Sequence, residues 1–226
     1  MIDAIKTSQI AMNQDQERLQ TISQNISNMQ TPAYKRQLIE KLDFKNQMHN
    51  AQILTQGSLV QTQNPKDIAL AGDGFFTLQT EEGIFYSRRG DLLTNNRGEL
   101  SSATGGLILG NNGIIQVDDN EFTIDTQGDI YIDNRKIDRL KIAQFSKPQT
   151  LQYRGRGLYE TSESPNTVIS TTRILQGFIE QSNVKSVDEM MDMVKISRHF
   201  EASQRAMHIA DSLLSTAINQ LGTAHE

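Results

Sequence analysis

Two stretches of this chain, one at each end, repeat their apolar residues every seven positions. In the stretch from residue 186 to residue 221, one row holds large side chains and a second row, three positions later, holds mostly small ones. The first row is Met193, Phe200, Met207, Leu214 and Leu221, and the second is Ile196, Ser203, Ala210 and Ala217. This heptad pattern predicts a long helix whose apolar seam must pack against a partner, because the seam would otherwise face water.

The first stretch, from about residue 3 to residue 30, has a matching pattern. Its apolar row is Ile5, Met12, Leu19 and Ile26. Many of the other positions are Gln or Asn, whose amides can form lateral hydrogen bonds without the desolvation cost of a charge. Such a face is either solvated or buried against other copies of the chain. The simplest arrangement pairs the two terminal helices side by side as a coiled coil.

Between residues 57 and 184 the apolar period changes from seven to two. Short apolar runs, such as residues 75–78 and 84–86, are separated by turns that contain Gly, Asn or Asp. This spacing predicts an antiparallel, hairpin-rich β domain. The expected fold class is therefore α+β. The expected parts are a terminal helical domain (1–32 plus 185–226), an extended connecting arm (33–56) and a mostly β domain (57–184).

Composition narrows the possible partners and compartments of the chain. Its 226 residues carry a net charge of -5, which argues against a nucleic-acid partner, since that usually requires a basic patch. The absence of Cys excludes disulfides and thiolate zinc sites. No apolar run approaches the roughly 20 residues of a membrane-spanning helix, so no membrane insertion is expected. The first residues lack the pattern of a cleaved signal peptide, so any export would use another route.

The chain shows no recognisable catalytic, cofactor or metal-binding pattern. The four histidines, His49, His199, His208 and His225, have none of the usual metal-ligand spacings. The glycines of residues 72–74 precede a predicted strand, whereas a dinucleotide site requires a helix there. We therefore expect no enzyme and no cofactor. Two other readings remain open: a binding module dimerised by a coiled coil, and a cell-wall hydrolase, which would need paired carboxylates in a cleft.

Four short motifs follow one another along the chain. Their characteristic residues are Asn25, Asn28, Thr31 and Tyr34 in the first, Gly72, Gly74 and Phe76 in the second, Gly90 and Gly98 in the third, and Glu180, Ser182 and Asn183 in the fourth. In this order and over nearly the whole chain, the motifs resemble those of the bacterial flagellar rod and hook proteins. Ala33 departs from the pattern, because glycine is commoner there in the family.

The resemblance implies a structural subunit of the flagellar basal-body rod, not an enzyme. Such subunits assemble with themselves and with other rod subunits into a helical tube that crosses the periplasm and transmits torque from motor to hook. Export would use the flagellar type III apparatus without a cleaved signal peptide. The two apolar rows of the terminal helices would then be the self-assembly surface. A single inserted β domain resembles the larger rod proteins, and we favour the proximal-rod type over a distal-rod or hook-type protein.

Overall fold

The computed structural model describes residues 2–41, 48–118, 121–165 and 172–223. The chain divides into two compact units, each of which is built from separate pieces of the sequence. The helical unit consists of residues 1–28, 37–53 and 184–226, and the β unit of residues 29–36 and 54–183. The expected α+β class, with terminal helices around a mostly antiparallel β domain, is confirmed.

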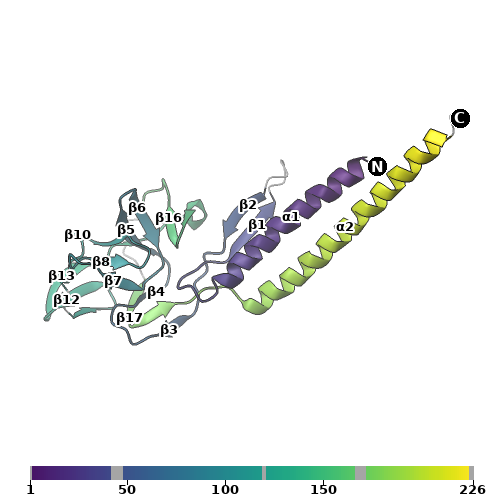
Figure 1. Ribbon diagram of the computed structural model, residues 1–226. Helices are drawn as coiled ribbons and strands as arrows, with labels where there is room; N and C mark the ends of the chain where they lie inside the picture. Colours follow the sequence, from purple (N-terminus) through teal and green to yellow (C-terminus); the bar gives the residue numbers. More distant parts are fainter. Residues whose placement is uncertain (1, 42–47, 119–120, 166–171, 224–226) are drawn as a thin grey trace. The chain divides into compact units, whose positions relative to one another are not determined.

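The helical unit contains α1 (Ile2–Ser27) and α2 (Ser186–Thr223), which run alongside each other in opposite directions (Figure 1). The second helix begins at the expected residue. The first ends three residues earlier than expected, because the backbone N–H and the side-chain amide of Asn28 both donate to the carbonyl of Gln24. Those bonds satisfy a carbonyl of the last turn, and Pro32 then prevents any continuation of the helix.

A small hairpin belongs to the same unit, where the sequence suggested only an extended arm. Strand β1 (Gln37–Lys41) pairs with β2 (Met48–Gln52) in antiparallel register, from Gln37 opposite Gln52 to Lys41 opposite Met48. The expected arm over residues 33–56 is thus divided. Residues 33–36 and 54–56 lie in the β unit, and residues 37–53 lie in the helical unit.

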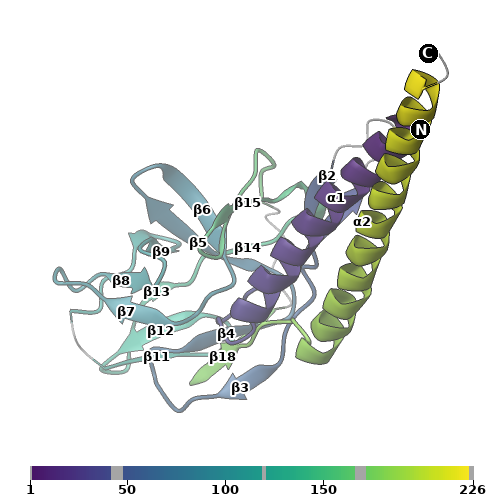
Figure 2. The ribbon, with the colours of Figure 1, turned by 45° about the vertical axis from the view of Figure 1, so that its right-hand side comes forward.

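The largest sheet of the β unit has nine strands, and all its pairs are antiparallel. Its strands in spatial order are β15 (Gln152–Gly155), β16 (Leu158–Glu160), β6 (Gly83–Ser87), β5 (Phe75–Thr80), β9 (Leu107–Gly110), β8 (Leu100–Ser102) and β7 (Leu92–Thr94), with β10 (Gly113–Ile114) beside β9 and β14 (Ile142–Ala143) beside β5. Figure 2 shows these strands and their turns. One turn is shaped by Asn95, whose side-chain oxygen accepts the N–H groups of Arg97 and Glu99.

Three smaller sheets complete the β unit, and two of them join its beginning to its end. Strand β4 (Ile68–Ala71) pairs with β17 (Arg173–Gln176), and β3 (Leu59–Gln61) pairs with β18 (Phe178–Glu180). The third sheet contains β11 (Phe122–Ile124), β12 (Asp129–Ile132) and β13 (Arg135–Arg139). A short 3-10 helix, η1, spans Pro148–Thr150. Strands from the beginning of the β unit's sequence thus pair with strands from its end. The β unit therefore cannot be complete before residue 180 is in place.

Apolar side chains from most of these strands form the core of the β unit. The central cluster includes Ile68, Phe76, Leu78 and Ile108, all nearly inaccessible to water. A second, aromatic cluster contains Phe75, Tyr86 and Tyr159, with the rings of Phe75 and Tyr159 packed edge to face. Burial raises the pKa of the Tyr159 hydroxyl far above its usual range.

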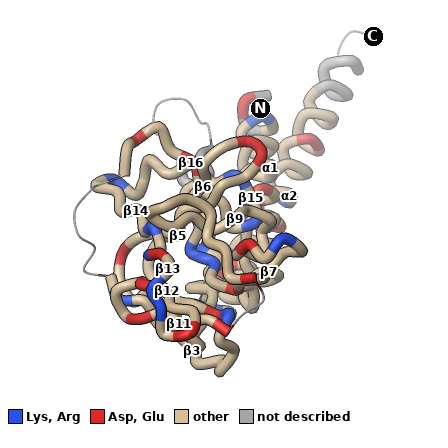
Figure 3. The backbone as a smooth tube through the Cα atoms, turned by 90° about the vertical axis from the view of Figure 1, so that its left-hand side faces the viewer, with Lys and Arg blue, Asp and Glu red and all other residues tan. Residues whose placement is uncertain are grey.

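Charged residues of the β unit are intermingled rather than sorted by sign, as Figure 3 shows around β11, β12 and β13. Asp129 on β12 is bonded by Arg139 and by Lys136, both on β13. These hydrogen bonds lower the pKa of the Asp129 carboxyl group far below its usual range, and the bond from Arg139 has the largest effect. In the described part of the chain, no helix is both long and apolar enough to span a membrane.

Candidate assembly site

The predicted seam of α2 is the less exposed stripe of that helix. Met193, Phe200, Met207 and Leu214 are all half-buried, as are Ile196, Ser203, Ala210 and Ala217 in the second row. On α1, the predicted residues Ile5, Met12, Leu19 and Ile26 are half-buried as well. Leu221 lies within α2, but its side chain is outside the described residues. The predicted rows are therefore half-buried positions of two helices that contact each other, and much of their apolar surface is still accessible.

Asn25 connects three segments of the helical unit. Its side-chain Nδ2 donates to Glu189 Oε2 of α2 at 3.1 Å and to the backbone carbonyl of Gln37 at 2.9 Å. Its Oδ1 accepts the N–H of Gln37 at 2.9 Å. The amide thus pairs with both backbone groups of the first residue of β1, as a neighbouring strand would. Asn25 was selected from the sequence only as a motif residue, and its contacts give that choice a physical reason.

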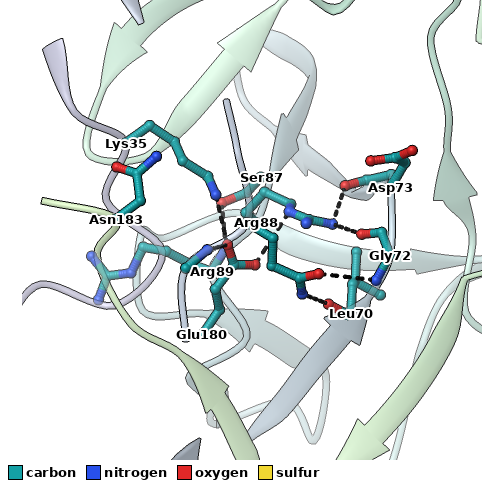
Figure 4. Close-up of polar contacts among 12 residues, drawn as sticks. Lys35, Leu70, Gly72, Asp73, Ser87, Arg88, Arg89, Glu180 and Asn183 are labelled. Atoms are coloured by element: carbon teal, nitrogen blue, oxygen red, sulfur yellow. Dashed lines mark hydrogen bonds and ion pairs between the residues drawn. The ribbon is translucent and has the colours of Figure 1, made fainter. Parts of the chain in front are cut away.

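The β unit contains a buried cluster of two cations around one carboxylate, shown in Figure 4. Lys35 Nζ lies 2.6 Å from Glu180 Oε1, and both side chains are about 1% exposed. Arg88 Nε lies 3.3 Å from the other oxygen, Glu180 Oε2. Gly57 donates its N–H to Glu180 Oε1 at 2.9 Å. Burial lowers the pKa of the Lys35 ammonium group, although the Glu180 carboxylate opposes this effect.

The other bonds of both cations go to backbone carbonyls. Lys35 Nζ donates to Thr55 at 2.8 Å, and Arg88 donates from one guanidinium nitrogen to Gly72 and Gly74, each at 2.8 Å. The Arg88 guanidinium also lies 5.8 Å from the centre of the Phe75 ring. A buried ion cluster of this kind tolerates the loss of a partner poorly, because the remaining charge has no water around it.

Backbone bonds join the same segments as the ion cluster. Ala33 donates its N–H to the Glu180 carbonyl at 2.7 Å, and Asn183 donates its N–H to the Tyr34 carbonyl. The Asn183 side chain accepts the Arg36 N–H at 2.7 Å and donates to the Thr55 carbonyl at 3.0 Å. The first and the fourth sequence motifs therefore meet here, at the segments that enter and leave the β unit.

The motif glycines allow close approach or unusual backbone angles. A Cβ atom on Gly90 would lie 1.6 Å from the carbonyl oxygen of Ile68. The backbone N–H of Ile68 in turn donates a hydrogen bond to the carbonyl of Gly90. No larger residue fits this position without moving the β4 strand. Gly72, Gly74 and Gly98 have positive φ angles. Of the other motif residues, Phe76 and Tyr34 are buried, and Asn28, Thr31 and Ser182 are half-buried.

Ala33 has a φ of 55°, in the left-handed region that favours glycine. This angle explains why glycine suits the position. We expect Ala33→Gly to change the free energy of unfolding by less than about 1 kcal/mol, because relief of strain and greater freedom of the unfolded chain oppose each other. Ala33→Val should cost about 2 kcal/mol or more, because a β-branched residue is strongly disfavoured there. Urea denaturation of both variants tests this, and equal losses would contradict it.

Sequence reasoning missed three buried charged residues of this site. Lys35 and Arg88 lie at positions of the first and third motifs but were given no role of their own, and Asp15 was not selected at all. A signal for Asp15 exists, because it lies three residues after Met12 and four before Leu19, inside the heptad rows. Within the described residues, no group of three or more His, Cys, Asp or Glu side chains could hold a metal ion.

Three protein-family models match the chain, in order. They are "Flagella basal body rod protein" over residues 5–35, "Flagellar hook protein FlgE/F/G D1 domain" over 69–132, and "Flagellar basal body rod FlgEFG protein C-terminal" over 175–221. The first covers most of α1, Asn25 and Lys35, and the third covers Glu180, Asn183 and α2. The polar contacts described above thus join the two terminal family segments within each unit.

Two curated relatives match over almost their whole length, and a third matches over about two thirds of its length. The chain is 26% identical to the flagellar basal-body rod protein FlgG of Borreliella burgdorferi, with 97% of this chain and 98% of the relative covered. It is 27% identical to FlgF of Mesorhizobium japonicum, with 99% of both chains covered. FlgG of Buchnera aphidicola subsp. Baizongia pistaciae is 30% identical over 71% of this chain and 66% of the relative.

The fold and the matched segments define an axial protein of the bacterial flagellum. More particularly, the chain belongs to the family of flagellar basal-body rod proteins. The expectation of a structural protein rather than an enzyme is confirmed by this family.

Proposed function

We propose that this chain polymerises through the seam of α1 and α2 into the rod of the flagellar basal body. The observation that carries the proposal is the helix pair itself, whose heptad residues remain half-exposed along the described length of both helices. A finite two-helix pair can bury only part of two long apolar stripes, so additional helices from other subunits would complete the burial. The relatives named as basal-body rod proteins support the same conclusion.

In this proposal α1 and α2 form a coiled coil that contacts other rod subunits as well as copies of the chain. The rod would cross the periplasm and transmit torque from motor to hook. The chain would reach it through the flagellar type III export apparatus. The β unit, which has its own apolar core, would give each subunit a folded body attached to the polymer.

We further propose that the subunit is of the proximal-rod type. In length the chain is more similar to one FlgF relative than to one FlgG relative. The alignment with the FlgF relative extends over 239 residues and covers 99% of both chains, whereas that with the Borreliella burgdorferi FlgG relative extends over 264. The additional positions of the second alignment are gaps in a chain of 226 residues. Cross-linking of the chain to labelled rod subunits in isolated basal bodies tests this, and contacts limited to the hook-side end would contradict it.

Leu214→Asp is expected to block assembly while leaving the β unit unchanged. Leu214 is a half-buried seam residue of α2, and an unpaired carboxylate buried there in the polymer would cost several kcal/mol. The variant should be secreted, show the thermal midpoint of wild type for its β unit, and form no rods, so that cells lose motility. Ser212→Asp is the matched control, because Ser212 is exposed on the same helix. Normal swimming of Leu214→Asp cells would exclude the seam as an assembly surface.

A further inference from the structure

The most deeply buried positions of the helix pair are polar. Among the described residues of the two helices, the buried side chains are Asp15, Ile22 and Asn25 on α1 and Glu189 on α2. Asp15 is 2% exposed and Glu189 is 0% exposed, whereas the apolar seam residues around them are only half-buried. Burial of carboxylates is unfavourable unless each has a partner, so these groups constrain the pairing more strongly than the seam does.

Asp15 has a polar partner on the opposite helix. His199 Nδ1 lies 2.5 Å from Asp15 Oδ2, and within the described part of the chain this ring is the polar contact of that carboxylate. The Asp15 side chain is 3% exposed and that of His199 is 62% exposed. The imidazole thus approaches from the edge of the helix pair and covers an otherwise buried anion.

The two polar contacts between the helices define the same register. Asp15 lies ten residues before Asn25 on α1, and His199 lies ten residues after Glu189 on α2. In an antiparallel pair this equality means that a single alignment of the helices satisfies both contacts. Figure 1 shows α1 and α2 lying side by side and running in opposite directions.

The apolar rows alone do not define a register. Both helices repeat every seven residues, so a slip by one heptad would again place apolar side chains opposite one another. Such a slip would move Asp15 from His199 to either Asp192 or Ala206, and neither is a partner for a carboxylate. Because Asp15 is close to the middle of α1, a full-length pairing of α1 with a second α1 would bring two Asp15 carboxylates together.

We propose that the Asp15–His199 pair determines which helices pair and in which register. It is a positioning contact that acts against slipped and homotypic pairings, as buried polar residues do in coiled coils. This inference rests on the proposed function, because register matters most for a helix pair that presents its seam to other subunits. With the register fixed, every subunit would present the same apolar surface of α1 and α2 to its neighbours.

The experiment uses the absence of Cys in the chain. Ala11→Cys with Ser203→Cys reports the native register, because these positions lie four residues beyond Asp15 and His199 in opposite directions. Ala11→Cys with Ala210→Cys reports a slip of one heptad. All three residues are half-buried and lie on the packed faces of the helices. Each pair is placed in the full chain, oxidised mildly in solution, and the disulfide-linked species are separated by non-reducing electrophoresis.

In the otherwise wild-type chain, the native pair should oxidise within one chain and the slipped pair should not. Asp15→Leu combined with His199→Leu should raise the ratio of slipped to native cross-links roughly tenfold, which corresponds to about 1.4 kcal/mol. Cross-links between two copies through residue 11 should also appear. Exchanging the partners, with Asp15→His and His199→Asp, should restore the native ratio.

An unchanged ratio in the leucine variant would overturn the proposal, because the seam would then set the register alone. If circular dichroism shows that the leucine variant loses helix content, the test rests on the variant with Asp15→His and His199→Asp. Restoration of the native cross-link in that variant supports the proposal, and failure to restore it overturns the proposal. The ratios are measured in solution, so they report on the register whether or not the chain forms rods. Failure of the proposed function would instead appear as normal motility of the seam variant described above.

Discussion

Glu180→Gln is expected to destabilise the β unit by about 3–5 kcal/mol, because it leaves Lys35 and Arg88 buried without a neutralising anion. The substitution keeps the size of the side chain and an oxygen that can accept the Gly57 N–H. The loss therefore measures charge rather than packing. At this size of protein it should lower the thermal midpoint by on the order of 10 °C, as measured by circular dichroism in the β-sheet region.

Glu160→Gln is the matched control for this experiment. Glu160 pairs with Arg154 at 2.7 Å, but these side chains are 45% and 53% exposed. An exposed pair contributes less than about 1 kcal/mol, so the control should melt within a few degrees of wild type. Similar losses in the two variants would show that burial of the Lys35–Glu180 pair has no special effect.

A double variant separates charge balance from simple loss of contacts. Lys35→Met removes one of the two cations that Glu180→Gln leaves behind, so the two substitutions together should be less destabilising than their summed single effects by at least about 1 kcal/mol. Additive losses would contradict the view that the cluster acts as one electrostatic unit. The lowered pKa of Lys35 is consistent with this view, since burial already disfavours its charge.

The helices and most β hairpins could be predicted from local patterns in the sequence. The start of α2 at Ser186 was predicted from a local capping pattern, Ser186 followed three residues later by Glu189, because apolar spacing and helix boundaries are properties of neighbouring residues. Turns such as that at Asn95 were recognisable for the same reason, since the side chain that shapes the turn lies within it. The β1–β2 hairpin was missed because residues 37–52 are polar and show no clear alternation.

The ion cluster could not be derived from local patterns. Lys35, Arg88 and Glu180 are far apart in the sequence, and their meeting depends on the pairing of β3 with β18 and of β4 with β17. Nothing in these short strands specifies a partner more than a hundred residues away. The resemblance to rod and hook proteins selected Glu180 and Asn183 as motif residues, and the structure supplies their contacts with Lys35 and Arg36. Asp15 was missed although its heptad position could have indicated a buried charge, and only the structure reveals its partner.

The segment of residues 29–36 is expected to be essential for the stability of the β unit. A fragment of residues 29–183 should fold, because it contains every piece of that unit. A fragment of residues 54–183 begins three residues before the boundary expected from the sequence, and it retains Thr55 and Gly57. It lacks Lys35, the Ala33 N–H that bonds the Glu180 carbonyl, and the Arg36 N–H that bonds Asn183.

The shorter fragment should therefore unfold at a thermal midpoint at least about 10 °C lower, since it loses a buried ion pair together with backbone bonds. Lys35→Met in the longer fragment is the control, because it removes the ammonium group but keeps the backbone contacts, and its midpoint should lie between the two. Equal midpoints for the two fragments would show that residues 29–36 only rest on a β unit that is already complete. An intermediate value for Lys35→Met would instead show that the N-terminal segment closes the β unit through both its charge and its backbone.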